Sequence, residues 1–210
     1  VGIETSGQEK ELTNTVLGVD VGVKELAVIS DGRVYKNINK TKEVKRLNKK
    51  LRRLQRQVSR KYEKNKEGVR YVKTSNIVKI EHQIKHVHRK LTNIRNNHLH
   101  QATANIVKTK PCKIVVEDLN ISGMMKNKHL AKAVSNQKLH ELIRQLEYKC
   151  EKYGILFVKA DRWFPSSKMC SNCGNVKKDL KLSDRMYYCD CGHCMDRDVN
   201  ASINLANYIV

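Results

Sequence analysis

Five cysteines gathered near the C-terminal end constrain this 210-residue chain more than any other feature. Cys170 and Cys173 form a Cys-x-x-Cys pair, and after fifteen intervening residues come Cys189, Cys191 and Cys194. Two such groups, each in a tight turn, have the spacing with which a zinc ribbon holds one tetrahedral ion. Five thiols compete for four places. Spacing alone favours Cys191-x-x-Cys194 as the second pair, whereas Cys189 with Cys191 is a shorter pair that keeps the Cys-Gly step. The clustering argues against a distributed disulfide framework, and a reducing cytosol favours metal-bound thiolates.

Short β-rich runs open the ordered part of the chain. Residues 16–23 and 26–29 are rich in aliphatic and β-branched side chains, and Asp31-Gly32 is a tight-turn pair before residues 33–35. These runs predict a three-stranded meander. Residues 1–14 show no apolar period and are predicted to be a linker or tail.

A change of period predicts a helical hairpin over residues 40–108. Aliphatic residues recur at steps of three and four, which is the stripe of an amphipathic helix, at Val44, Leu47, Leu51, Leu54 and Val58. A second stripe runs from Ile77 to Ile106, with Gly68 near the break between the two helices. The hairpin is therefore predicted to be an insertion in the fold.

The remaining elements complete an α/β fold. A short buried strand is expected at residues 113–116, a helix from about Ser135 to Gly154, a strand at residues 155–158 and a last helix from Asp198. This order of elements predicts an α/β layer with a mixed sheet.

The positive charge of the chain is concentrated in the predicted hairpin. The whole chain carries a formal charge of +21, and residues 40–73 hold 15 Lys and Arg against 3 acidic residues. A face of one sign favours nucleic-acid phosphates as the partner. One Trp and two Phe are too few for a membrane-interface helix. The candidate nucleic-acid-binding residues are Lys45, Arg46, Lys49, Arg52, Arg53, Arg56, Arg60, Lys168 and Arg197.

Apolar runs in this chain stay well below the roughly 18 residues that a membrane span needs. The first residues also lack the basic and apolar pattern of a signal peptide. A cytoplasmic location is therefore expected, without a membrane partner.

Three carboxylates stand where chemistry could occur. Asp20 interrupts an apolar strand, Glu117 ends the next buried strand, and Asp198 opens the last helix. If they converge, they repel one another unless a cation lies between them, and such oxygen ligands suit Mg²⁺ or Mn²⁺. A pair of these ions supports phosphodiester hydrolysis. Taken singly, each carboxylate is explained as well by a salt bridge or, for Asp198, by capping of the helix.

Four motifs resemble, in their order, those of the TnpB (OrfB) family of transposon-encoded nucleases, which are relatives of type V CRISPR effectors. They are LGVDVG at residues 17–22, IVVEDL at 114–119, SSKMCSNCG at 166–174 and CGHCMDRDVNA at 191–201. The resemblance covers roughly residues 15–208.

The resemblance implies a RuvC-like endonuclease of RNase H fold with an inserted zinc ribbon, which cleaves DNA with divalent metal and a guide RNA. It assigns the three RuvC acids to Asp20, Glu117 and Asp198, with Asp196 as the alternative for the third. The implied zinc ligands are Cys170, Cys173, Cys191 and Cys189, which leaves Cys194 as the alternative ligand.

The resemblance also implies a domain plan. A RuvC-like core spans residues 15–161 with the basic insertion at 40–108, a zinc ribbon spans 162–195, and residues 196–210 hold the last RuvC motif and the C-terminal helix. Family members have a large region before the first motif, and this chain has about 16 residues there and starts at Val1. A truncated product or an excised domain is therefore expected. The competing hypothesis is a catalytically weak or inactive nucleic-acid-binding protein or regulator.

Residues at the entrance of the expected ribbon leave two roles open. Trp163, beside Phe164 and Pro165, is predicted to be a packing anchor rather than a platform for base stacking. Arg162, like Lys168 and Arg197, could touch the scissile strand, although ordinary charge pairing would also explain it.

Overall fold

A computed structural model describes residues 11–181 and 183–209 of the chain. These residues form two compact units. The first unit consists of two segments, the described residues up to Asn37 and those from Leu99 onward, and the second unit spans Ile38–His98. The predicted tail lies largely outside the described residues, and the first strand already begins at Thr13.

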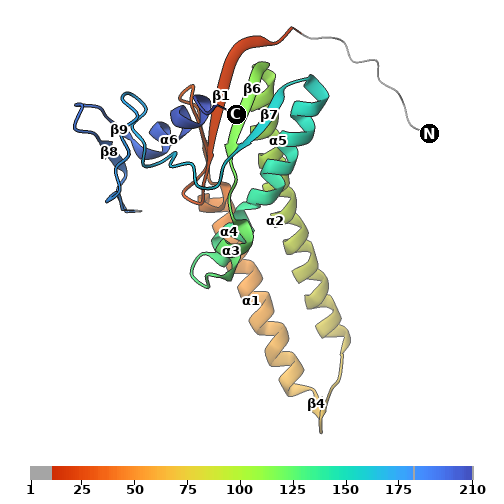
Figure 1. The fold of residues 1–210 in the computed structure, drawn as a ribbon. Helices are drawn as coiled ribbons and strands as arrows, with labels where there is room; N and C mark the ends of the chain where they lie inside the picture. The colour runs from red at the N-terminus through yellow and green to blue at the C-terminus, as the bar shows by residue number, and fades with distance from the viewer. Residues whose placement is uncertain (1–10, 182, 210) are drawn as a thin grey trace. The chain divides into compact units, whose positions relative to one another are not determined.

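A five-stranded mixed sheet forms the centre of the first unit (Figure 1). Its strand order is β3-β2-β1-β6-β7. Neighbours β1, β2 and β3 pair antiparallel, whereas β1 with β6 and β6 with β7 pair parallel, which confirms the mixed α/β sheet. The strands are β1 (Thr13–Val21), β2 (Glu25–Ile29), β3 (Val34–Lys36), β6 (Pro111–Glu117) and β7 (Leu156–Ala160).

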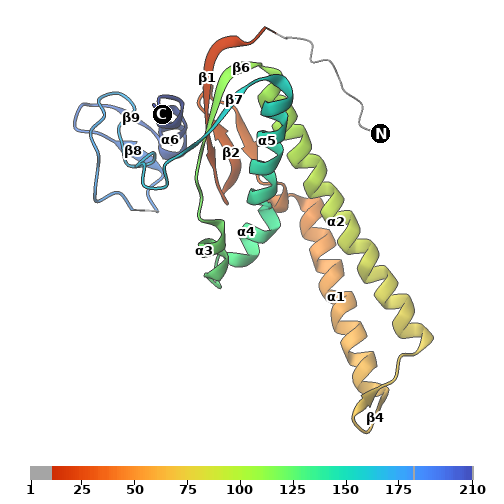
Figure 2. The same cartoon turned by 45° about the vertical axis from the view of Figure 1, so that its right-hand side comes forward.

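Strand β6, between β1 and β7, shows how both faces of this sheet are covered. Its Ile114 and Val116 belong to the core formed with helix α5 (Leu139–Tyr153). Val115, between them, points to the opposite face, where it packs with Leu205 of helix α6 (Arg197–Ala206). Successive side chains of a strand alternate between faces, so a wholly apolar run needs a cover on each side. Both views show α5 and α6 on opposite sides of the sheet (Figure 1, Figure 2).

Helix α6 lies against β1 at a glycine. A Cβ atom built on Gly18 would lie 1.9 Å from the carbonyl oxygen of Ser202 and 2.4 Å from the amide nitrogen of Ala206. Only a residue without a side chain therefore allows this backbone-to-backbone contact. The contact fixes the depth at which α6 sits on the strand.

The connection between β6 and β7 differs from the single helix that the sequence predicts. Three helices fill it: α3 (Ile121–Lys126), α4 (Ala131–Gln137) and α5. Lys138 has left-handed backbone angles, φ 55° and ψ 45°, and separates α4 from α5. The apolar period continues across this residue, which is why the sequence does not reveal the break.

The second unit is built on two paired helices. Helix α1 (Lys42–Lys64) follows the short 3₁₀ helix η1 (Ile38–Lys40), and helix α2 (Ser75–Lys108) begins in this unit and continues beyond it. The small β4 (Lys66–Glu67) and β5 (Arg70–Tyr71) strands connect them. The predicted stripes form the core between the helices, with buried residues Val44, Leu47, Leu51, Leu54, Ile80, Val87 and Leu91.

The cysteine-rich segment contains little regular structure. Strands β8 (Met186–Tyr188) and β9 (Cys194–Asp196) pair antiparallel and lead directly into α6.

None of the helices in the described part of the chain combines the length and the apolarity needed to cross a membrane.

Substituting Gly18 tests the contact between α6 and β1. Gly18→Ala should lower the free energy of unfolding by about 3 kcal/mol, because the added methyl group meets rigid backbone rather than a movable side chain. Gly22→Ala is the matched control, since its nearest contact would be an ordinary 3.5 Å. Urea unfolding of both variants measures the difference, and equal midpoints for Gly18→Ala and wild type would contradict the close approach.

Candidate active site and metal centre

Asp20, Glu117 and Asp198 line one pocket of about 400 Å³ in the first unit. Val19 pairs with Val116 in the parallel register of β1 and β6, so Asp20 and Glu117 occupy the next step along the two strands. Asp198 comes from the first turn of α6, the helix that Gly18 admits close to β1. Residues far apart in sequence thus meet at one end of the parallel strands, where α/β sheets commonly bind ligands.

Charge and burial in this pocket raise the pKa values of two carboxyls. Burial, then the neighbouring charges of Asp198 and Glu117, raise the pKa of Asp20 to about 7. Burial and the charge of Asp118 raise the pKa of Glu117. Arg197 opposes the shift at Asp20 but does not cancel it. Near neutral pH the pocket therefore retains a proton, which a bound divalent cation would displace.

Asp196, and not Asp198, caps α6. The Oδ1 atom of Asp196 accepts hydrogen bonds from the amides of Asp198 at 2.9 Å and Val199 at 3.3 Å. The hypothesis that Asp198 caps the helix is therefore wrong. Capping occupies the Asp196 carboxylate, whereas Asp198 lines the pocket with the other two acids.

The predicted basic residues near the acids lie in different places. Arg197 lines the pocket, and its Nη2 lies 3.3 Å from Oδ1 of Asp198. Lys168 is exposed, donates to the carbonyl oxygen of Lys178 at 3.3 Å and does not line the pocket. Arg162 forms a 2.7 Å ion pair with Asp118.

Sequence reasoning missed four polar residues of the pocket: Lys24 and Glu25 beside the first strand, and two more from the cysteine-rich segment. Ser167 and Arg185 line it although both belong to the cysteine-rich segment, which the sequence associates only with zinc. Ser167 falls within the SSKMCSNCG motif, so a signal for it existed. Arg185 lies in no recognisable pattern and becomes visible only in the fold.

Four thiols form a compact group in the cysteine-rich segment. Within the described ranges, this is the only set of three or more potential ligand atoms that all lie within 4.8 Å of one another, and it comprises Cys170, Cys173, Cys189 and Cys191. Cys194, which spacing alone favours, belongs to strand β9 and is not part of the group, so the preference from spacing is wrong.

The spacing of the thiols fits a tetrahedral ion. The Sγ atoms of Cys170 and Cys191 are 3.8 Å apart, and those of Cys173 and Cys189 are 3.6 Å apart. Metal–sulfur bonds of about 2.3 Å in a tetrahedron place the sulfurs about 3.8 Å apart. A backbone hydrogen bond from His193, then one from the Cys189 thiol, lower the pKa of Cys191 to about 6 and favour its thiolate. The group is suited to hold a metal ion.

Two buried asparagines attach the thiol segment to α6. Asn200 accepts a hydrogen bond from the amide of Ser171 at 3.0 Å and donates to the carbonyl of Met169 at 2.6 Å. Asn204 donates to the carbonyls of Ser166 and Met169, each at 2.7 Å. The helix that carries Asp198 is thereby bonded to the turn that carries Cys170.

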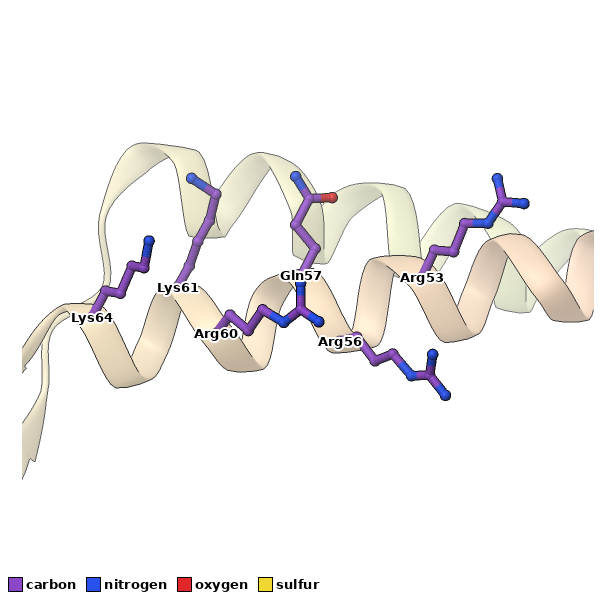
Figure 3. A pocket seen from close by; sticks show the side chains of 6 residues that line it. All are labelled: Arg53, Arg56, Gln57, Arg60, Lys61 and Lys64. Carbon is purple, nitrogen blue, oxygen red and sulfur yellow. The ribbon is translucent and has the colours of Figure 1, made fainter.

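Helix α1 presents an exposed cationic surface in the second unit. We call this surface, which consists of the seven Lys and Arg residues of α1 named below, the basic α1 face. All seven side chains are exposed, and none of them forms an ion pair with any residue that the structure describes. Side chains toward the C-terminal end of the helix line a shallow hollow of about 460 Å³ and extend outward from α1 (Figure 3). The members of the basic α1 face are Lys45, Arg46, Lys49, Arg52, Arg53, Arg56 and Arg60.

Trp163 is not the packing anchor that the sequence suggests. Its side chain is 85% exposed, whereas the neighbouring Phe164 packs on Tyr208 with ring centroids 4.9 Å apart. Of these two adjacent aromatic residues, Phe164 packs against the core and Trp163 lies outside it, so the anchoring role belongs to Phe164.

The raised pKa of Asp20 predicts a pH-dependent stability. Its folded pKa of about 7 exceeds the unfolded value of 3.8, so the folded state keeps a proton that the unfolded state has lost between these values. In buffer without added magnesium or manganese, the free energy of unfolding should fall as pH rises towards 7, by up to about 1.4 kcal/mol per pH unit. Urea unfolding from pH 5 to 8 measures this slope.

Asp20→Asn should flatten that slope, because asparagine does not titrate. Asp179→Asn is the control, since Asp179 is an exposed acid outside the pocket, and it should keep the wild-type slope. Parallel profiles for wild type and Asp20→Asn would show that Asp20 does not titrate abnormally.

Comparison with known proteins agrees with this architecture. A family model described as "Probable transposase" (OrfB, IS605) matches residues 1–128, and a "Cas12f1-like, TNB domain" model matches residues 140–205. Two solved structures share the fold: "Cryo-EM structure of CRISPR-Cas12f Ternary Complex" at TM-score 0.64 and 22% identity, covering 98% of this chain and 41% of that one, and "Cryo-EM structure of the Cas12f1-sgRNA-target DNA complex" at TM-score 0.59 and 21% identity, covering 91% and 49%.

Curated relatives carry the name "Putative RNA-guided DNA endonuclease". One from Streptomyces pristinaespiralis is 37% identical over 193 residues, which are 92% of this chain and 45% of the relative. One from Mycobacterium tuberculosis is 36% identical, covering 94% and 42%, and one from Escherichia coli is 31% identical, covering 91% and 48%. The chain thus spans less than half the length of these relatives. On the strength of the model that matches more than half of its residues, the chain belongs to the TnpB (OrfB) family of transposon-encoded proteins.

Proposed function

We propose that this chain carries the cutting part of a transposon-associated, RNA-guided DNA endonuclease that hydrolyses phosphodiester bonds with divalent metal. The observation that carries the proposal is the pocket that Asp20, Glu117 and Asp198 line together. The names of the relatives and the likeness to Cas12f support the same class of reaction. We further propose that the mixed sheet is RNase H-like, of the RuvC type.

The three carboxylates would hold Mg²⁺ or Mn²⁺. Burial and the mutual repulsion of the acids raise the pKa of Asp20, and a divalent cation would relieve that repulsion. When bound, a pair of such ions supplies a nucleophile from water and stabilises the leaving oxygen. Arg197, fixed against Asp198, would orient that carboxylate and offer a positive charge to the phosphate.

DNA and a guide RNA are the proposed partners. The basic α1 face would contact phosphates. Side-chain cations without ion-pair partners can replace the counterions condensed on a nucleic acid, and the release of these counterions favours binding. Lys168 and Arg197 remain candidates for contacts with the cleaved strand. The cytoplasmic location expected from the sequence stays a prediction.

We propose that the four-thiol group holds a structural Zn²⁺. Four protein ligands leave no open coordination position, so the ion would stabilise the fold rather than take part in the reaction. In this view residues 162–195 form a zinc ribbon inserted before the last RuvC motif at residues 196–210, the core spans residues 15–161, and the helical insertion spans residues 40–108.

A cleavage assay tests the proposed reaction. Single-stranded DNA is incubated with the chain and Mg²⁺ or Mn²⁺, and Asp20→Asn and Asp198→Asn should each reduce cutting more than about 100-fold, since even outer-shell partners of a metal contribute 10- to 100-fold. Asp196→Ser is the matched control, because serine also caps a helix and Asp196 does not line the pocket. It should retain most of the activity.

Two outcomes of this assay would overturn the proposal. Equal cutting by wild type and Asp20→Asn would exclude the carboxylate pocket as the source of the activity. Binding of DNA without any metal-dependent cutting would favour the competing hypothesis, a nucleic-acid-binding protein or regulator.

Metal analysis tests the zinc site. The purified chain should contain about one zinc ion, and Cys170→Ser should lose it together with part of the thermal stability. Cys194→Ser is the matched control, because Cys194 lies in the same segment but outside the group, and it should keep the ion. Loss of zinc in Cys194→Ser and not in Cys189→Ser would reverse the assignment of the fourth ligand.

A further inference from the structure

Trp163 is the most exposed aromatic side chain among the described residues and the single tryptophan of the chain. Its side chain is 85% exposed, so it contributes little to the core. A tryptophan left in water forgoes the burial of a large apolar surface, and tryptophan is enriched at binding interfaces.

The backbone around Trp163 is firmly held, so its exposure is not the result of a loose loop. The Trp163 amide donates to Oδ1 of Asp161 at 2.8 Å, and the Phe164 amide donates to the Asp161 carbonyl at 3.0 Å. The Asp161 amide donates to the hydroxyl of Tyr208 at 3.2 Å, and Phe164 packs on the ring of Tyr208. The indole is therefore carried outward by an anchored turn.

This turn follows the end of strand β7, at the same end of the parallel strands as the carboxylates. Ala160, the last residue of β7, pairs with Glu117 in the parallel register, and Trp163 follows three residues later. A nucleic-acid strand with a phosphodiester in the carboxylate pocket would have unpaired bases on either side of that bond. Aromatic side chains beside such a strand stack on its bases.

Local charge permits the approach of a polyanion. Asp118, next to Glu117, is paired with Arg162 at 2.7 Å, and Asp161 accepts the hydrogen bond from the Trp163 amide. These two carboxylates are thus engaged by donors of the chain, which carries a charge of +21 as a whole. The Arg162 guanidinium offsets the charge of Asp118, which lowers the repulsion that phosphates meet at this end of the strands.

We propose that Trp163 is a stacking platform for an unpaired base of the nucleic-acid strand that enters the carboxylate pocket. The inference rests on the proposed function, to which it adds a contact that recognises the base rather than the phosphate. Stacking on an indole tolerates any base, so the platform would position a strand without selecting its sequence.

Because Trp163 is the only tryptophan, its fluorescence reports the contact directly. The titration uses the Asp20→Asn chain without added Mg²⁺ or Mn²⁺, so that it measures binding and not cutting. An oligothymidylate of about 12 nucleotides should quench the emission, whereas an abasic oligomer with the same number of phosphates should not. Oligouridylate provides the RNA arm and shows which strand is preferred. Equal quenching by the base-bearing and abasic oligomers would overturn the proposal.

Anisotropy of a labelled oligomer tests the energetic weight of the contact. Trp163→Ala should weaken binding of oligothymidylate about 5- to 100-fold and leave binding of the abasic oligomer unchanged, whereas Trp163→Tyr should keep most of the affinity. The control Lys168→Ala, at an exposed cation of the same unit, should weaken both oligomers alike, because it removes a proposed phosphate contact.

Three results would overturn the stacking platform. The first is an unchanged affinity of Trp163→Ala for oligothymidylate, and the second is an equal loss of affinity for both oligomers. The third is altered sedimentation of Trp163→Ala with unchanged DNA binding, which would assign the indole to contact with a second copy of the chain. Failure of the cleavage assay alone would leave these binding results interpretable, so the two proposals can fail separately.

Discussion

The contact between helix α6 and strand β1 at Gly18 is the constraint on which the candidate active site depends. Two carboxylates lie on neighbouring parallel strands, where backbone hydrogen bonds fix their separation. The third lies on a helix, and only the absence of a side chain at Gly18 lets that helix approach to backbone distance. The same strand thus supplies one acid directly and determines the position of another.

The sequence predicts the elements of the fold well where one period persists. The aliphatic stripes of α1 and α2 and the β-rich runs of the meander specify their elements because each has one buried face. Lys138 breaks a helix in which the apolar period continues, so no local signal marks the break. Trp163 and Phe164 are adjacent aromatic residues before a proline, and only the tertiary position of Tyr208 decides which of them packs against the core.

Predicting the candidate site from sequence succeeds for residue types and fails for their geometry. Asp20 attracts notice because a charge in an apolar strand needs compensation, and Cys170 because of its spacing from Cys173. The choice between Asp196 and Asp198 requires the cap hydrogen bonds, and Arg185 enters the pocket from a segment without any pattern that points there. Spacing alone favours Cys194 over Cys189, whereas the fold brings Cys189 to the other thiols and keeps Cys194 in a strand.

The amides of Asn200 and Asn204 make the cysteine-rich segment inseparable from the helix that follows it. Both side chains are almost fully buried, and their partners are backbone groups of residues 166–171. If that segment were excised, these amides would lose their hydrogen bonds inside the protein, each of which contributes about 0.5 to 1.5 kcal/mol. The cysteine-rich segment thus stabilises helix α6 and is not a detachable module. A domain boundary drawn between the segment and the helix in the sequence does not separate two units that fold independently.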